Sequence, residues 1–300
     1  MRKISIITAT FNSAKTLCAT LDSVLKQDYT NIEHIIIDGK SSDNTLAIAQ
    51  SYKKLYANKG FEFKIFSERD NGIYDAMNKG LARATGEIIG FLNSDDFFAS
   101  KYIASLIAWG FAKPTNDIEI IYANINYVNN SLQTQRILRG KPFSPLSFKL
   151  GFHPPHPSFY AKKELFVRYG GFKLQYKIAS DYELMLRFLQ KYRAKSLYID
   201  ECFVKMRLGG ASNASVANIL RANMECFKSW QENALSKFPL FVVLKPLHKC
   251  FDVFKNLIDS NKGGGQYEVI LWLSQTLPFS INHKINFLHS TSQMQEVRCA

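Results

Sequence analysis

Two adjacent carboxylates, Asp95 and Asp96, follow the apolar run 87–92 and the polar pair Asn93 and Ser94. Hard divalent cations such as Mg²⁺ and Mn²⁺ prefer carboxylate oxygens and keep several waters, so one or two Asp side chains suffice to hold one. A cation bound here could stabilise the charge that develops on a departing phosphate group. The competing interpretation is that the Asp pair caps a helix over 97–110.

Another carboxylate, Asp181, stands at the start of the segment 180–192, whose apolar spacing predicts a helix. In that place it could act as a general base and take the proton from an attacking hydroxyl. A plain helix cap, made by Asp181 or by Ser180, is the alternative. Glu183 is the second candidate base, although the helix would turn it partly away.

The elements that must position these residues alternate along the first hundred positions. β-branched and apolar runs predict strands at 4–10, 33–38, 62–67 and 87–92. Helices are expected between them, the first capped by Ser13, the second ending near residue 57 and the third over 72–85. This alternation predicts a mostly parallel α/β sheet, which binds ligands beyond the carboxyl ends of its strands. Polar residues lie at or just after all four ends, namely Thr10, Asp38, Glu68 and Asp95.

The rest of the chain is less regular. Strands are expected at 118–127, 133–139 and 196–206. Segment 141–158 is rich in Pro and aromatic residues, which indicates an ordered loop system over a cleft. After about residue 216 the pattern becomes helical.

The charge is unevenly distributed within a total of +13. Residues 1–100 contain 12 Lys/Arg and 12 Asp/Glu, whereas residues 101–220 contain 17 and 7. The downstream excess suits an acceptor or an anionic membrane, or else it is a solvated basic face. Five Cys without paired spacing fit reduced thiols in a cytosolic protein. The opening MRKISIITATFN indicates a buried strand rather than a signal peptide.

Other classes of protein fit less well. A dinucleotide oxidoreductase would carry G-x-G-x-x-G after the first strand, where TATFNSAK has no glycine. A nucleotidyltransferase acting on sugar phosphates would show a Gly-rich basic loop there. A basic nucleic-acid-binding protein is opposed by the concentration of acidic residues in the first third and by the absence of a recognised binding motif, so no specific nucleic acid is expected. A basic binding protein with an inactive site remains the other alternative.

Four segments occur in a familiar order: SIITATFN, IIIDGKSSDNT, SERDNGIYDAMNKGLARATGEIIGFLNSDD and ASDYELMLR. Together they closely resemble glycosyltransferase family 2, of GT-A fold, over roughly residues 3–210. The resemblance is to the bacterial enzymes that build capsule, exopolysaccharide or O-antigen. It implies an inverting enzyme that moves a sugar from a nucleotide-sugar donor to a glycan or lipid-linked glycan acceptor, with Mn²⁺ or Mg²⁺ as cofactor.

The resemblance also implies roles for particular residues. In the family, the first strand ends against the nucleotide, and the acidic residue closing the second strand contacts the base or ribose; Asp38, in that place, could instead only anchor its own turn. Asp75 and Lys79 lie at helical spacing and would either contact the donor or form a helical ion pair. The donor-binding residues implied are Thr8, Thr10, Asn12, Asp38, Asp70, Asn71, Asp75, Lys79, Asp95 and Arg207.

The metal and the base follow from the same resemblance. The family motif Asp-X-Asp matches Ser94-Asp95-Asp96, so Asp96 takes the place of the metal-ligating Asp and Asp95 contacts ribose or metal. His156 would be a further metal or phosphate ligand, or an uncommitted loop histidine, with His153 as its substitute. Asp181 takes the place of the catalytic base.

The implied organisation is a GT-A catalytic domain over 1–215, with a nucleotide-sugar half at 1–100 and an acceptor half at 101–215, followed by a helical extension at 216–300. Segment 238–258 is too charged to span a bilayer but suits a helix lying in its interface, and packing on the catalytic domain is its alternative. Segment 269–282 is uncharged but short, and is expected to pack on the catalytic domain. We therefore expect a cytoplasmic protein, peripheral at the inner face of the cytoplasmic membrane.

Overall fold

The computed structural model describes residues 1–113, 117–129, 131–208, 216–239 and 242. The chain divides into two compact units, Met1–Lys245 and Pro246–Ala300. Segment 238–258 lies almost wholly outside the described residues, and segment 269–282 lies wholly outside them. Within the described part of the chain, no helix is both long enough and apolar enough to cross a bilayer.

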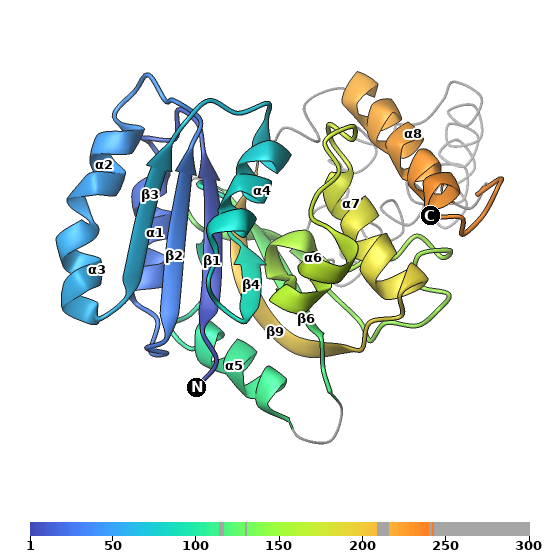
Figure 1. Cartoon of the computed structure of the whole chain (residues 1–300), viewed down its shortest axis with the longest axis horizontal. Helices are drawn as coiled ribbons and strands as arrows, with labels where there is room; N and C mark the ends of the chain where they lie inside the picture. The colour runs from blue at the N-terminus through green and yellow to red at the C-terminus, as the bar shows by residue number, and fades with distance from the viewer. Residues whose placement is uncertain (114–116, 130, 209–215, 240–241, 243–300) are drawn as a thin grey trace, which may run out of the picture. The chain divides into compact units, whose positions relative to one another are not determined.

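The first half of the sheet is parallel. Strands β1 (Ile4–Thr10), β2 (Ile32–Asp38), β3 (Glu62–Ser67) and β4 (Ile88–Phe91) lie in the order β3-β2-β1-β4. Figure 1 shows the arrowheads of β1, β2 and β3 at one edge. The register pairs Thr10 with Asp38 and Asp38 with Ser67, so the polar strand ends do meet at that edge, as the sequence predicts.

The second half of the sheet is mixed. Strand β8 (Tyr160–Lys162) is antiparallel to both β4 and β6 (Ile120–Val128). Strand β9 (Ser196–Arg207) runs parallel to β6. The strands β5 (Phe97–Phe98) and β7 (Thr134–Leu138) pair antiparallel with β9 and β6, respectively. The curled α/β sheet confirms the predicted fold class.

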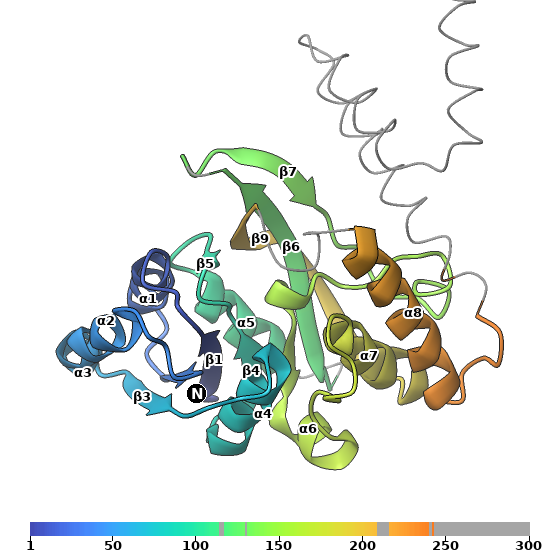
Figure 2. The same ribbon diagram turned by 90° about the horizontal axis from the view of Figure 1, so that it is seen from above.

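Helices cover both faces of the sheet. One face carries α1 (Leu17–Leu25), α2 (Thr45–Ser51), α3 (Lys53–Lys59) and α5 (Ile103–Ala112). The other carries α4 (Ile73–Arg83), α6 (Lys163–Tyr169), α7 (Ser180–Met185) and α8 (Val216–Glu232). Figure 2 shows α1 and α4 on opposite sides of β1. Alternation along β1 supplies both cores, because Ile4 and Ile6 pack toward α1 while Ile7 and Ala9 pack toward α4.

Two local expectations are wrong, and a third is confirmed with a change of helix type. Helix α1 begins at Leu17, and Ser13 does not cap it with its side chain, since the Ser13 Oγ lies 2.8 Å from the Ser94 Oγ. No helix spans 97–110: Phe97 and Phe98 pair with β9, which overrides their local tendency, and α5 starts at Ile103. The predicted helix over 180–192 is confirmed from Ser180 to Lys191: it is α-helical to Met185 and π-helical over Leu186–Lys191, with the Tyr192 N–H bonded to the Arg187 carbonyl.

Helix α8 belongs to the first compact unit. It packs against α7, and Trp230 and Cys226 on it are almost fully buried. The compact unit therefore continues past residue 215, the end of the catalytic domain expected from the sequence.

Candidate active site

The carboxylate that ends β2 is held by its neighbours. Asp38 is buried and accepts hydrogen bonds from the Ser67 Oγ at 2.6 Å, the Ser41 N–H at 3.3 Å and the Thr10 Oγ1 at 3.4 Å. The Ser41 hydroxyl also donates to it. These contacts give Asp38 the turn-anchoring role that was the alternative to nucleotide contact, and they draw the ends of β1, β2 and β3 together.

Asn12 and Thr8 are placed differently. Asn12, in the left-handed region at φ 49°, accepts a 2.9 Å hydrogen bond from the Ser42 N–H and stays exposed at the same edge. Thr8 lies inside the sheet, 2.9 Å from His34 Nε2, and His34 Nδ1 lies 2.8 Å from the Tyr56 hydroxyl. Burial lowers the pKa of His34 to about 3. The structure thus places the Thr8 side chain in the core, apart from the other strand-end residues.

The segment after β3 folds back toward β2. Asp70 Oδ1 accepts from the Gly72 N–H at 2.9 Å, and a Cβ on Gly39 would lie 2.5 Å from Asp70 Oδ2, so a larger residue at position 39 would displace the Asp70 carboxylate. Asp75 accepts from the Asn71 N–H at 2.9 Å and lies 3.2 Å from the Lys79 Nζ. The helical ion pair weighed against donor contact is therefore present.

Asp95 and Asp96 sit in the least compensated environment of the site. Asp96 is fully buried; Asn93 Nδ2 is 3.4 Å from its Oδ2, while its Oδ1 has no partner among the described residues. Burial, and then the charge of Asp95, raise the pKa of Asp96 well above its usual value. Burial also raises the pKa of Asp95, against the attraction of Arg207. Neither Asp caps a helix, because β5 follows them.

These two carboxylates fit a divalent cation. A bound cation would offset the burial that raises both pKa values and the repulsion from Asp95 that raises the pKa of Asp96 further. No group of three or more His, Cys, Asp or Glu that could hold a metal occurs in the described ranges. A cation here would therefore need further ligands from water or from a diphosphate, which is the usual arrangement for Mg²⁺.

Arg207 lies beside this pair. Its guanidinium carbon is 5.5 Å from the centre of the Phe97 ring, and its Nε is buried and lacks a hydrogen-bond partner in the described structure. Its charge lowers the pKa of both Asp95 and Asp96. The structure brings Arg207 and the Asp pair together, which suits contact with a diphosphate.

Asp181 lies in the first turn of α7 without capping it. Ala179 is the N-cap residue and Ser180 begins the helix. Asp181 Oδ1 accepts from the Tyr182 N–H at 2.8 Å and lies 3.2 Å from the Tyr74 hydroxyl. Tyr74, which the sequence analysis missed although it stands inside the quoted motif DNGIYDAMNKG, links this carboxylate to α4.

His156 connects Asp181 to the end of β4. Its ring stacks on Phe91, the last residue of β4, at 5.9 Å between ring centres, and meets Phe172 edge-on at 5.7 Å. Burial lowers the pKa of His156, and the nearby charge of Asp181 partly opposes this. The ring is therefore neutral near pH 7, the form in which histidine binds metals. His153, its proposed substitute, lies 3.1 Å from the Pro154 carbonyl oxygen.

Glu183, the alternative base, is committed to an ion-pair network. It is fully buried and bonded to Arg187 at 2.9 Å, to Lys173 at 3.0 Å and to Asn233 at 2.9 Å. Burial alone would raise the pKa of Glu183, but these three partners lower it overall. Its carboxylate has no lone pair facing solvent, which leaves Asp181 as the better placed base.

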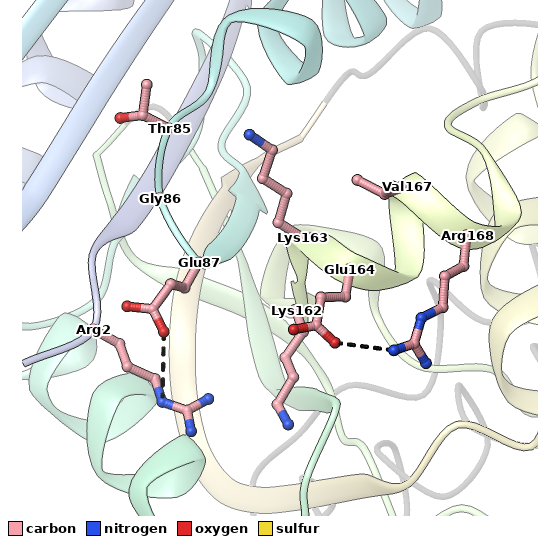
Figure 3. Close-up of a pocket in the computed structure, with 9 residues that line it drawn as sticks. All are labelled: Arg2, Thr85, Gly86, Glu87, Lys162, Lys163, Glu164, Val167 and Arg168. Atoms are coloured by element: carbon pink, nitrogen blue, oxygen red, sulfur yellow. Dashed lines mark hydrogen bonds and ion pairs between the residues drawn. The ribbon is translucent and has the colours of Figure 1, made fainter.

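A pocket of about 420 Å³ lies at the other edge of the sheet, near the start of β1 and β4. Figure 3 shows its basic side chains and two of their ion pairs. Arg2 lies 4.0 Å from Glu87 and Arg168 lies 3.4 Å from Glu164. Lys162 pairs with Asp117 at 2.8 Å, and Lys163 donates to the Ala84 carbonyl. Because these cations are already paired, and the pocket is remote from the carboxyl ends of β1–β3, it is not the candidate site.

Comparison with known proteins identifies the family. The sequence pattern of glycosyl transferase family 2 matches residues 5–176. An uncharacterized glycosyltransferase of Mycobacterium tuberculosis is 31% identical over 198 residues, covering 61% of this chain and 68% of the relative. A PGL/p-HBAD biosynthesis glycosyltransferase of Mycobacterium bovis is 29% identical over 217 residues, covering 71% and 80%. The Escherichia coli protein WfgD, a UDP-Glc:alpha-D-GlcNAc-diphosphoundecaprenol beta-1,3-glucosyltransferase, is 34% identical over 132 residues, covering 43% and 47%.

Solved structures share the fold. The mannosyltransferase PcManGT of Pyrobaculum calidifontis, in complex with GDP-Man and Mn²⁺, matches with a TM-score of 0.60 at 15% identity, covering 97% of this chain and 81% of PcManGT. Residues 1–349 of Staphylococcus aureus TarS, in complex with UDP-GlcNAc, match with a TM-score of 0.58 at 21% identity; the match covers 78% of this chain and 66% of that one, just under two thirds of its length. The family match over more than half of the chain and the shared sheet together show that this chain belongs to glycosyl transferase family 2 and has the GT-A fold.

Proposed function

We propose that the protein transfers a sugar from a nucleoside-diphosphate sugar to the hydroxyl of a glycan or lipid-linked glycan, with inversion at the anomeric carbon. The observation that carries the proposal is the Asp95-Asp96 pair after β4, in which Asp96 is fully buried and its Oδ1 has no partner among the described residues. A cation at this place supplies charge stabilisation to the departing diphosphate. PcManGT is seen with Mn²⁺ and GDP-Man, which supports Mn²⁺ or Mg²⁺ for this chain.

Different residues of this chain bind the cation, the diphosphate and the nucleotide. Asp95 and Asp96 would hold the cation, and Arg207 contacts the diphosphate. His156 forms no group of three metal-binding side chains with the two Asp residues in the described ranges, so it serves as a neighbour of Asp181 rather than as a ligand. The edge residues Thr10, Asn12, Asp38, Asp70 and Asn71 shape the nucleotide site, and Asp75 and Lys79 border it. We retain Thr8 only as a buried support of this edge, because its side chain faces His34.

Inversion requires a base on the side of the anomeric carbon opposite the leaving group. Asp181 supplies it: the carboxylate accepts the acceptor proton as the hydroxyl attacks, and the hydrogen-bond contact with Tyr74 orients it. The lowered pKa of His156 keeps that neighbour neutral, so it does not neutralise the charge of the base.

The acceptor is proposed from the relatives and from charge. WfgD acts on a diphosphoundecaprenol-linked sugar, and residues 101–220 of this chain carry the basic excess that an anionic lipid surface attracts. We therefore propose a peripheral position at the inner face of the cytoplasmic membrane for this chain, with segment 238–258 as the contact.

A ligand screen tests this function. Thermal unfolding is followed with UDP, GDP and their sugars, each with Mn²⁺ and with chelator, because a ligand at a hundredfold excess over its Kd stabilises the native state by about 2.7 kcal/mol. We expect stabilisation by one nucleotide only when Mn²⁺ is present. Transfer to a sugar-diphospho-lipid is then followed by NMR. Full turnover after chelation would reject the metal, and a product that retains the donor configuration would reject inversion.

A further inference from the structure

The loop that leads into α7 is held by one carboxylate from α8. Glu225 Oε1 accepts from the Lys177 N–H at 3.0 Å, and Oε2 accepts from the Ile178 and Ala179 N–H groups, each at 2.9 Å. Only 7% of Glu225 is exposed. Hydrogen bonds to a charged acceptor are about twice as strong as neutral ones. Three of them fix the backbone up to the residue that precedes α7.

The same loop is held from the opposite direction by α4. The Tyr74 hydroxyl lies 2.6 Å from the Ile178 carbonyl oxygen and 3.2 Å from Asp181 Oδ1. The peptide groups on either side of Ile178 are therefore hydrogen-bonded to Glu225 and to Tyr74. Since Asp181 is only three residues further on, a rotation of this loop would change its approach to Tyr74.

Contacts from the end of α8 and the residue after it secure the positions that follow Asp181. The Trp230 indole N–H donates to the Tyr182 hydroxyl at 2.9 Å, and Asn233 Nδ2 donates to Glu183 Oε1 at 2.9 Å. The α8 region thus binds the chain both before and after Asp181. These polar contacts are made in addition to the burial of the apolar face of α8.

We propose that Glu225 is a positioning residue for Asp181, so that α8 is an integral part of the active site; this rests on the role of Asp181 as base under the proposed function. A general base must lie within hydrogen-bond reach of the proton that it takes. A displacement of about 1 Å can cost roughly 100-fold in rate. The three bonds of Glu225 restrict such a displacement without contact with substrate.

The test compares Glu225→Gln with Glu232→Gln. A carboxamide offers one acceptor oxygen and points its own N–H groups at the loop, so Glu225→Gln loses at least one of the three bonds. Glu232 also lies on α8 and binds the same loop, through Gln175 at 2.8 Å, but farther along the chain from Asp181. We expect Glu225→Gln to lower kcat roughly 10- to 100-fold, with the donor KM within about twofold of wild type. Glu232→Gln should change neither.

Amide hydrogen exchange provides a readout that needs no turnover. In Glu225→Gln the amides of 177–179 should exchange faster than in wild type, whereas those of β1 and β2 should not change. Glu225→Asp keeps the charge on a side chain one methylene shorter, so it should fold and show smaller effects of the same kind. It serves as the second variant if Glu225→Gln does not fold.

The outcomes separate this inference from the proposed function. In an Asp181→Asn background, Glu225→Gln should leave the residual rate unchanged, because both changes act through one base. Normal kcat and normal exchange in Glu225→Gln, with Asp181→Asn inactive, would reject the positioning role alone. Wild-type turnover by Asp181→Asn would reject the base itself. A KM that rises in proportion to the fall in kcat/KM, with kcat unchanged, would also overturn the inference.

Discussion

Replacement of Asp181 by Asn separates a catalytic carboxylate from a structural one. The side chain accepts a 2.8 Å hydrogen bond from the Tyr182 N–H and lies 3.2 Å from the Tyr74 hydroxyl. The Asn carbonyl oxygen can accept both. Ala179, rather than Asp181, occupies the N-cap position, so no cap is removed. The structure therefore predicts a small loss of stability.

The structural role and the catalytic role of Asp181 predict effects of different size for Asp181→Asn. A hydrogen bond contributes about 0.5–1.5 kcal/mol, and Asp181→Asn keeps these bonds in a neutral form, so the free energy of unfolding should fall by at most about 1 kcal/mol. A missing general base lowers the rate by about 10²–10⁴, which corresponds to roughly 3–5 kcal/mol of activation free energy. The expected effect on turnover is thus far larger than the effect on stability.

The assay measures kcat, donor affinity and melting temperature for wild type, Asp181→Asn and Asp181→Ala. Both variants should bind the donor nucleotide normally and lose turnover, and Asp181→Ala should also melt lower because it loses the two hydrogen bonds. Turnover near that of wild type in Asp181→Asn would show that the proton is accepted elsewhere. A loss of activity only in proportion to lost folded protein would support a structural role.

Three further outcomes are expected. Without metal, Asp96→Asn should have a melting temperature at or above that of wild type, because it replaces an uncompensated buried carboxyl. It should lose Mn²⁺-dependent nucleotide binding, and its turnover should fall about 100-fold or more. Unchanged metal-dependent binding would refute the cation site. Burial would raise the pKa of Glu33, but the hydrogen bonds from Lys64, Ser5 and Thr85 outweigh it and hold this pKa at about 2. The contribution of Glu33 to the free energy of unfolding should therefore be complete above about pH 4.5 and be lost as the pH falls toward 2. In denaturant titrations across this range, the free energy of unfolding should fall less for Glu33→Gln than for wild type. Truncation after Lys245 should release the protein from membrane fractions without changing its melting temperature. Truncation after residue 215 also removes Trp230 and should lower the free energy of unfolding by at least about 3–5 kcal/mol. Equal melting temperatures of the two shortened chains would refute the packing role of α8.

Much of the parallel first half of the sheet could be predicted from local sequence. The β-branched runs of β1 and β2 have a strong tendency to form buried strands, and parallel strands need helical crossovers. Their carboxyl ends must meet at one edge, so Thr10 and Asp38 were predictable neighbours. The motif that contains Asp95 and Asp96 was likewise visible in the sequence, because its residues are contiguous in the chain.

Other features depend on pairing between distant segments. Phe97 and Phe98 form a strand only because β9 lies beside them, which removes the helix that Asp95-Asp96 would have capped. The Thr8 side chain is hydrogen-bonded to His34 on the neighbouring strand. The backbone angles at Ala179, and not the local sequence, decide that Asp181 lies in the first turn of α7 and not at its N-cap.

The contribution of α8 shows the difference most clearly. Its helical pattern was evident in the sequence, and from that pattern alone it was assigned to an extension after residue 215. Only the tertiary structure brings Glu225 to the N–H groups of 177–179, nearly fifty residues earlier in the chain. Hydrophobic periodicity specifies that a helix forms and which face it buries, but a carboxylate finds its donors only when the packed layers bring the two segments into contact.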